Sequence, residues 1–241
     1  MHCLFRTEFF TKDETAQKLN QGFPMFHDLG KLDSRLEGIF MIEGVGLSSN
    51  VYVIEGEKIT LIDAGVGNEN NRLDLALQRL KQPLQNIEKV ILTHNHPDHS
   101  GGLLTIQSIS SPEIFAHELD SYGLEELYPN AIKWLHDNEV LAASQRRLRV
   151  IHTPGHTAGS ICLLDETNRV LFSGDTVFAD GFFGRTDLPT GNTSELVESL
   201  RSLSELDVES LLPGHERILV SNASSHIKLS YETASTSLDT Q

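Results

Sequence analysis

Four side chains that could bind metal ions lie within six residues of one another: His94, His96, Asp98 and His99. They follow the apolar run 90–92 directly, so they stand where a buried strand gives way to a loop. Neutral imidazole and carboxylate groups suit Zn²⁺, and also iron or manganese. Such a cluster is hard to explain as a packing device, and it predicts a metal site on a loop.

Three further candidate ligands each follow an apolar run later in the chain: His156, Asp175 and His215. His94 and His96 are two residues apart in an extended segment, so they project to the same side and can share one ion. Asp98 and His99, beyond Pro97, can turn towards a second ion. His156 would then complete the first set and His215 the second, which leaves Asp175 as a carboxylate able to bridge both.

Two divalent ions about 3.5 to 4 Å apart would hold a bridging hydroxide, because the pKa of the parent water falls to around 7. Asp98 is expected both to ligate and to orient this nucleophile. Two divalent cations against Asp98, Asp175 and one hydroxide leave a local surplus of positive charge, which can stabilise an oxyanion. Without metal, the cluster would bury carboxylates and imidazoles at a considerable desolvation cost.

The candidate ligands require strands that deliver them to one edge of a fold. Residues 51–54 and 58–62 are rich in β-branched side chains around a glycine-containing turn, which predicts a hairpin. Asp63 ends this hairpin, either as a turn residue or as a partner that orients a metal ligand. Residues 89–93 predict a strand before His94. Further strands are expected at residues 112–117, 148–152, 161–164, 169–172 and 208–212.

Helices are expected between these strands, and the alternation predicts a layered α/β architecture. Apolar residues at helical spacing predict a helix over residues 73–80, and the run 101–106 predicts the start of another. Residues 118–147 are predicted to be mainly helical. Asn192, with Glu195 three residues later, predicts a helix start. A last helix is expected to end at about Ala234.

Net charge and the distribution of apolar residues argue against nucleic acid and membranes as partners. The formal net charge is −15, from 34 acidic against 19 basic residues, and this field disfavours nucleic acid as a partner. The two cysteines form no disulfide framework, and the chain shows neither a leader pattern nor an apolar run long enough to cross a bilayer. We therefore expect a cytoplasmic protein with a small-molecule substrate and no membrane partner; a homodimer is left open.

The motif His94-x-His96-x-Asp98-His99 and the later ligands His156, Asp175 and His215, with Asp63 as the first motif, resemble those of the metallo-β-lactamase superfamily. The resemblance covers residues 38–220. It implies an αββα four-layer sandwich, in which helices flank two mixed β-sheets. It also implies two divalent ions at one edge, with zinc as the expected metal and iron or manganese as the alternatives. The domain is expected at residues 37–235, after an N-terminal extension of unknown function at 1–36 and before a flexible tail at 236–241.

The segment from Gly174 to Pro189 is similar to that of the glyoxalase II-like hydrolases (hydroxyacylglutathione hydrolases). This resemblance implies that Arg185 binds an anionic group of the substrate; the alternative is a surface arginine in a glycine-rich loop. Arg217, however, stands where glyoxalase II has a substrate-contacting tyrosine. The chain also ends too soon after His215 for the helical domain that supplies most glutathione contacts in that enzyme.

The leading hypothesis is a binuclear metallohydrolase that uses the metal-bound hydroxide to cleave a thioester or a related ester, with an anionic thioester as substrate. The nearest alternative is a persulfide dioxygenase. The resemblance implies that such an enzyme would bind a single iron through His94, His156 and Asp175. A nucleic-acid phosphodiesterase or nuclease, or a lactonase of the same fold, ranks lower.

Overall fold

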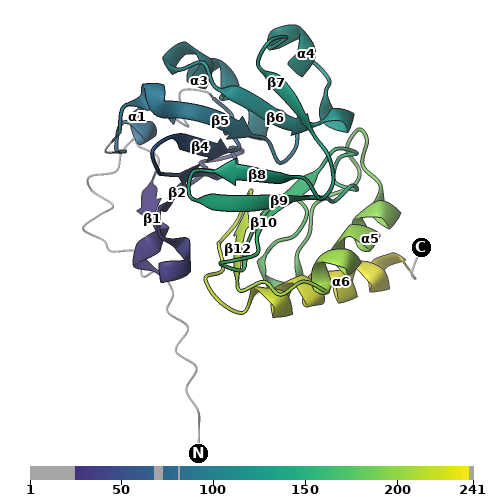
Figure 1. Ribbon diagram of the computed structural model, residues 1–241. Helices are drawn as coiled ribbons and strands as arrows, with labels where there is room; N and C mark the ends of the chain where they lie inside the picture. The colour runs from purple at the N-terminus through teal and green to yellow at the C-terminus, as the bar shows by residue number, and fades with distance from the viewer. Residues whose placement is uncertain (1–24, 68–72, 81, 239–241) are drawn as a thin grey trace, which may run out of the picture.

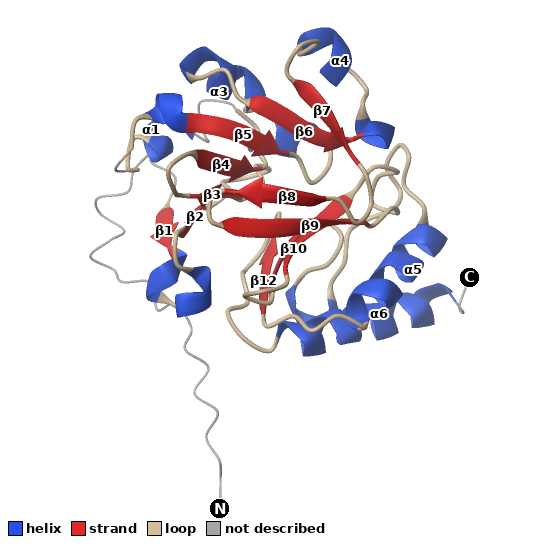
Figure 2. Cartoon of the chain, viewed as in Figure 1, coloured by secondary structure: helices blue, strands red, loops and turns tan. Residues whose placement is uncertain are grey.

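The computed structural model describes residues 25–67, 73–80 and 82–238. Two mixed β-sheets lie face to face, and helices cover the outer face of each (Figures 1 and 2). This arrangement confirms the predicted αββα sandwich.

The first sheet has seven strands in sequence order. Its first four strands are antiparallel neighbours and its last four run parallel, so four consecutive carboxyl ends meet at one edge. The strands are β1 (Phe26–Asp28), β2 (Ile39–Ile42), β3 (Val51–Ile54), β4 (Ile59–Ile62), β5 (Ile87–Ile91), β6 (Glu113–His117) and β7 (Ile132–Leu135).

The second sheet has five strands in the order β12-β11-β10-β9-β8. Only β11 and β12 pair in parallel, with a register shift between Phe172 and Gly174. The strands are β8 (Val140–Ala143), β9 (Arg146–His152), β10 (Ile161–Asp165), β11 (Val170–Gly174) and β12 (Ser210–Pro213).

Two groups of helices form the outer layers. The helices α1 (Leu73–Leu77), α3 (Leu103–Ile109) and α4 (Leu124–Leu127) cover the first sheet, and α5 (Thr193–Ser204) and α6 (Ala223–Leu238) cover the second (Figure 1). The short helix α2 (Pro97–Ser100) lies within the histidine-rich loop. The described residues also form five 3₁₀ turns: η1 (Leu29–Lys31), η2 (Ser34–Leu36), η3 (Leu84–Asn86), η4 (Glu118–Asp120) and η5 (Ala179–Gly181).

Alternation along the strands builds three apolar layers. In β3, Tyr52 and Ile54 point between the sheets, whereas Val51 and Val53 point towards the helices of the first sheet. A third cluster fills the space between the second sheet and α5 and α6. The sandwich therefore has an apolar core on both faces of each sheet, which makes a rigid support for the loops at its edge.

Most of the predicted elements are present. The hairpin is β3 and β4, and Asn192 caps α5 by accepting a hydrogen bond from the Glu195 backbone N–H at 3.2 Å. The helix predicted over residues 73–80 is shorter, since α1 ends at Leu77 and turns follow.

The prediction that residues 118–147 are mainly helical is wrong. Only η4 and α4 are helical there; the remainder supplies β7, β8 and the start of β9. β7 is held by parallel pairing with β6, and β8 by a tight turn at Ser144 that returns the chain along β9. Pairing with strands already in place outweighs the weak local preference of these short runs.

Residues 25–36 belong to the sandwich: β1 pairs with β2, and Leu29 and Leu36 are fully buried between the sheets. Residues 1–24 of the predicted extension lie outside the described residues. The last helix runs beyond Ala234 to Leu238. Within the described residues, no helix combines the length and the apolar character needed to cross a membrane.

Candidate metal centre

All seven predicted ligands converge at the edge of the sandwich where strands of both sheets end. His94, His96, Asp98 and His99 follow β5; the others follow strands of the second sheet. The ligand atoms fall into three overlapping groups, each within 4.8 Å: His94, His96 and His156; His94, His99 and Asp175; Asp98, His99 and His215. Residues up to 121 positions apart in the chain thus face one small volume.

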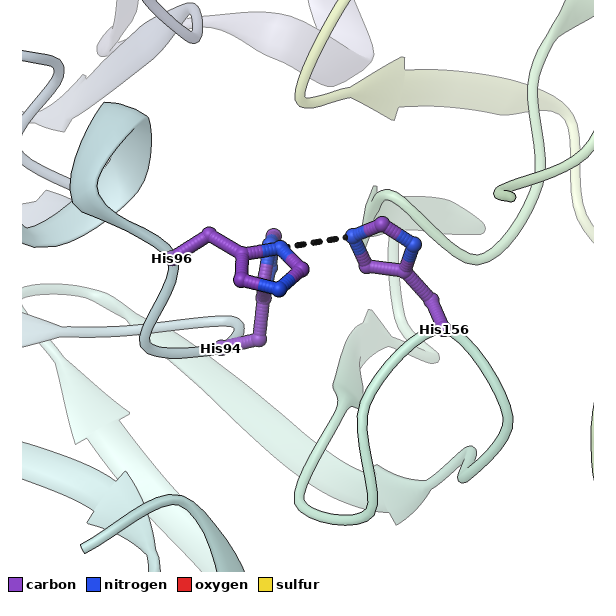
Figure 3. Close-up of side chains that lie close together, drawn as sticks. All are labelled: His94, His96 and His156. Atoms are coloured by element: carbon purple, nitrogen blue, oxygen red, sulfur yellow. Dashed lines mark hydrogen bonds between the residues drawn. The ribbon is translucent and has the colours of Figure 1, made fainter. Parts of the chain in front are cut away.

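The first group is a triangle of imidazole nitrogens (Figure 3). His94 Nε2 and His156 Nε2 each lie 3.0 Å from Nδ1 of His96. The three rings are nearly perpendicular to one another, with interplanar angles of 84 to 88°. Ligands about 2.0 to 2.1 Å from a tetrahedral zinc ion have a comparable separation, so the triangle fits one ion with an open position.

The group of Asp98, His99 and His215 lies beside the first, with Asp175 between them. His215 Nε2 is 3.1 Å from Oδ2 of Asp98. Asp175 Oδ2 is 3.5 Å from His215 Nε2 and 3.6 Å from His156 Nε2. One carboxylate therefore faces a histidine of each group, which is the position that a bridging ligand requires.

Two buried polar atoms at this point form no hydrogen bond and face each other only as an ion pair at 3.3 Å: His99 Nε2 and Asp175 Oδ1. Buried polar atoms are nearly always satisfied in folded proteins. Both atoms are ligand atoms of the right type, in groups that also hold Asp98, His215 and His94. The donor set and its unsatisfied atoms therefore fit divalent metal ions.

Burial and neighbouring charges set the protonation of the site. Burial, reinforced by the surrounding histidines, holds the pKa of His94 well below its usual value. Burial acts to raise the pKa of Asp175, but the nearby histidines outweigh it and bring the pKa to about 2. Burial acts to lower the pKa of His99, but Asp63 and Asp175 outweigh it and raise the pKa well above the usual value.

Asp63 contacts one candidate ligand, His99, from a buried position at the end of β4. It is 1% exposed and adopts a left-handed backbone conformation with φ of 59°. Its carboxylate accepts from the backbone N–H and the hydroxyl of Thr93, and lies 2.8 Å from Nδ1 of His99. This contact directs Nε2 of His99 into the cluster.

Arg185 lies beside the cluster and contributes through its backbone as well as its side chain. His156 Nδ1 donates to the Arg185 carbonyl at 2.8 Å, which leaves His156 Nε2 free to face the metal site. The guanidinium, predicted to bind an anion, forms two hydrogen bonds to the Asp187 carboxylate at 2.6 and 2.7 Å. Arg217, which replaces the tyrosine of glyoxalase II, is paired with Asp180.

A cavity of about 480 Å³ opens onto the cluster. Its polar side is formed by metal-ligand candidates and by Arg185, and its apolar side by Leu47, Leu188 and Pro189. Leu47 is 83% exposed at the rim. A substrate in this cavity would meet apolar surface and one cation in addition to the ligand cluster.

Sequence reasoning missed Asp120, whose buried carboxylate contacts the loops on both sides of the first ligand group. Its one sequence signal is its place just after a strand. His152, at the end of β9, hydrogen-bonds to the Ala158 carbonyl at 2.9 Å and stacks on His117. It thus supports the loop after His156 without touching the cluster.

The sequence profile of the metallo-β-lactamase superfamily matches residues 44–215, which span every candidate ligand. The chain belongs to this superfamily. A probable metallo-hydrolase of Methanocaldococcus jannaschii is 34% identical over 210 residues, covering 79% of this chain and 98% of the relative.

Two further relatives have names that specify an activity. An acyl-coenzyme A thioesterase of Gallus gallus is 31% identical over 74% of this chain and 77% of its own length. A hydroxyacylglutathione hydrolase of Haemophilus influenzae is 31% identical over 64% of this chain and 74% of its own length. Both belong to the hydrolase side of the superfamily, consistent with the glyoxalase II-like branch.

Solved structures share the fold. A metallo-β-lactamase family protein of Thermus thermophilus superposes with a TM-score of 0.69 at 22% identity, covering 84% of this chain and 81% of that one. A second protein, solved in a di-iron-bound form, superposes with a TM-score of 0.63 at 26% identity, covering 79% of this chain and 96% of that one.

Proposed function

We propose that this protein is a binuclear metal-dependent hydrolase that cleaves a thioester or a related ester. The observation that carries the proposal is the position of Asp175, whose Oδ2 lies within 3.6 Å of a histidine of each ligand group. Two relatives with about the same identity are named as a thioesterase and a hydroxyacylglutathione hydrolase, which supports thioesters as the substrate class.

His94, His96 and His156 would hold one ion, and Asp98, His99 and His215 the other, with Asp175 between them. When bound, two divalent ions supply Lewis acidity and make a water nucleophile available near neutral pH. Zinc suits this donor set of imidazoles and carboxylates, as do iron and manganese.

Asp98 would orient the nucleophile and hold its proton. Burial acts to raise the pKa of Asp98, but the hydrogen bond with His215, the charge of His99 and a backbone hydrogen bond together outweigh it and lower the pKa, so the carboxylate stays ionised at neutral pH. Asp98 lines the cavity, where a water hydrogen-bonded to it would be directed at a bound carbonyl carbon. Attack at that carbon breaks the C–S bond, and the leaving thiolate takes up a proton from solvent.

The cavity would orient the substrate by its two ends. Arg185 stands at the wall and can bind a carboxylate or phosphate of the thiol portion, once the substrate replaces Asp187 at the guanidinium. Leu47, Leu188 and Pro189 offer apolar contacts to the remainder. Substrates that combine an anionic group with an acyl thioester fit both features.

Metal analysis combined with a thiol-release assay tests the proposal. We expect about two divalent ions per chain and turnover of at least one glutathione or coenzyme A thioester. Asp175→Ala should lose metal and activity together. A protein loaded with two ions that cleaves no thioester, ester or lactone would contradict the proposal, and one iron per chain with oxygen consumed on glutathione persulfide would favour the dioxygenase instead.

A further inference from the structure

Asp120 is a buried carboxylate that stands outside the ligand groups yet contacts both loops from which the first group is built. It ends η4, three residues beyond β6, and is 7% exposed. β6 is the parallel neighbour of β5, so the carboxyl end of β6 lies beside the loop that carries His94 and His96. This placement puts Asp120 next to the candidate metal centre.

Three hydrogen bonds join the Asp120 carboxylate to the two loops. Oδ2 accepts the backbone N–H of Asn95 at 3.0 Å and the hydroxyl of Thr157 at 2.8 Å. Oδ1 accepts the backbone N–H of Gly159 at 3.0 Å. Asn95 stands between His94 and His96, and Thr157 follows His156 directly. A single side chain therefore links the residues that adjoin all three histidines.

Close packing reinforces this link. A Cβ at Gly159 would lie 2.7 Å from Cγ and from the backbone nitrogen of Asp120, so only glycine leaves room for the carboxylate. On the other loop, the Asn95 side chain donates to the backbone carbonyls of Asp120 and Tyr122 at 3.1 and 2.8 Å. Both loops are thus fixed to the same segment.

The hydrogen bonds to Asp120 fix the distance between the two loops that carry the histidines. Two backbone amides and one hydroxyl donate to the Asp120 carboxylate from two different loops, so its two oxygens fix the position of one loop relative to the other. The histidines approach from two different sheets, and the 3.0 Å separations between their nitrogens depend on how the loops are placed. Small loop displacements would alter the ligand triangle directly.

We propose that Asp120 is the positioning residue of the group formed by His94, His96 and His156. It holds the two loops at the separation that one metal ion requires, and it has no equivalent contact with the group of Asp98, His99 and His215 among the hydrogen bonds of the described residues. This inference rests on the proposed metal-dependent function. It predicts that loss of the Asp120 carboxylate weakens one ion and spares the other.

The test compares Asp120→Asn with Asp165→Asn. Asp165 is a matched control, since it is 1% exposed and accepts hydrogen bonds from Arg146 at 2.7 Å and from the Asn168 side chain at 2.8 Å, at the end of β10. Metal-free proteins are titrated with Zn²⁺ against a chelator and, separately, with Co²⁺ while the visible absorption is recorded. Thermal midpoints are measured on the same samples.

We expect Asp120→Asn to bind one of the two ions about 10- to 100-fold more weakly and to change the cobalt spectrum. Asp165→Asn should lower the thermal midpoint while both ions keep their wild-type affinity. Thr157→Val, which removes one donor to Asp120, should weaken the same ion to a smaller degree. It carries the test should Asp120→Asn fail to fold.

Unchanged affinity and an unchanged cobalt spectrum in both Asp120→Asn and Thr157→Val would overturn the inference, as would equal weakening of both ions. A wild-type protein that binds no metal would overturn the proposed function together with the inference. If the wild type binds two ions and Asp120→Asn binds both with wild-type affinity, the positioning role is overturned and the proposed function is not.

Discussion

Burial and two carboxylates have opposite effects on the pKa of His99, and this pKa decides whether the ring must lose a proton when metal binds. Asp63 lies on its Nδ1 side at 2.8 Å and Asp175 on its Nε2 side at 3.3 Å. The carboxylates prevail and raise the pKa of His99 well above its usual value of 6.5. The ring is therefore protonated at neutral pH before metal binds, whereas a metal ligand must be neutral.

Metal binding at about pH 7.5 is accordingly expected to release a proton from His99, and metal affinity should increase with pH up to the raised pKa. The stability that His99 contributes to the metal-free protein is present below pH 6.5 and is lost as the pH rises through the folded-state pKa. Calorimetry of Zn²⁺ binding in two buffers of different ionisation enthalpy measures the proton count. Asp63→Asn should lower it, and a count of zero in the wild type would contradict this account.

Arg185 and Asp187 form a pair at the cavity wall that bears on substrate choice. Both side chains are exposed, and the carboxylate occupies the Nε and Nη2 edge of the guanidinium, which an anionic substrate would also use. Asp187→Asn should therefore lower KM for anionic thioesters, and Arg185→Ala should raise it, with smaller changes in kcat. Steady-state kinetics on a charged and an uncharged thioester check this. Equal effects on both substrates would exclude an anion-binding role for Arg185.

At the scale of elements, the ends of β11 and β12 approach so closely that the backbone itself limits the space around the candidate ligands. A Cβ at Gly214, just beyond β12, would lie 2.5 Å from Asp175 Oδ1 and 2.5 Å from Cε1 of His99. Gly214 N–H also donates to the Gly174 carbonyl at 2.8 Å. The chain between the ligands Asp175 and His215 is thus held against the ligands themselves.

Gly214→Ala is expected to lower metal affinity by about 10-fold or more, because it displaces a ligand from each sheet. The control is Gly38→Ala, which has a positive φ of 76° and meets only the Glu55 carbonyl at 3.5 Å. It should cost about 1 kcal/mol of unfolding free energy through backbone strain and leave metal binding unchanged. Chelator competition measures the loss of metal affinity, and thermal melts measure the loss of stability. Wild-type metal affinity in Gly214→Ala would contradict this prediction and show that the site relaxes around the added methyl group.

In the whole molecule, the candidate metal centre lies across the boundary between the two sheets. His94 and His96 come from the first sheet and His156 from the second, so an ion bound there joins the two halves. The apolar cluster between the sheets, however, contains side chains of both sheets and none of the candidate metal ligands. The fold and the metal centre therefore have separate sources of stability.

Metal removal should lower the thermal midpoint without unfolding the protein at about 25 °C. Binding to the native state alone adds about 2.7 kcal/mol when free metal is about 100 times its Kd, and that increment disappears with chelator. Far-ultraviolet circular dichroism should retain the β-rich spectrum in EDTA. Loss of this spectrum at room temperature would mean that the metal is required for the fold.

Net charge is the other property of the whole molecule with a testable consequence. At −15, the chain should repel phosphate backbones, and we expect no binding to tRNA or single-stranded RNA at physiological salt. Fluorescence anisotropy with a labelled RNA measures this. Binding that weakens steeply as salt is raised would indicate a local basic surface and would reopen the phosphodiesterase hypothesis.

The sequence by itself determined the layered architecture and the set of candidate ligands that the fold brings together. His94-x-His96-x-Asp98-His99 is a local cluster, and each later ligand follows an apolar strand, so type and spacing suffice to identify them. The hairpin of β3 and β4 and the cap at Asn192 were also predictable, because both depend on neighbours within a few residues.

Tertiary structure decided what depends on distant partners. β7 and β8 were predicted as helix because runs of four residues have a weak preference, and only pairing with β6 and β9 makes them strands. Asp120 meets its partners 25 to 39 positions away, and the Arg185 guanidinium pairs with Asp187 in a way that composition does not reveal. The residue types of the candidate ligands can be recognised from short stretches of sequence. The distance between the loops that carry them depends on contacts between strands far apart in sequence.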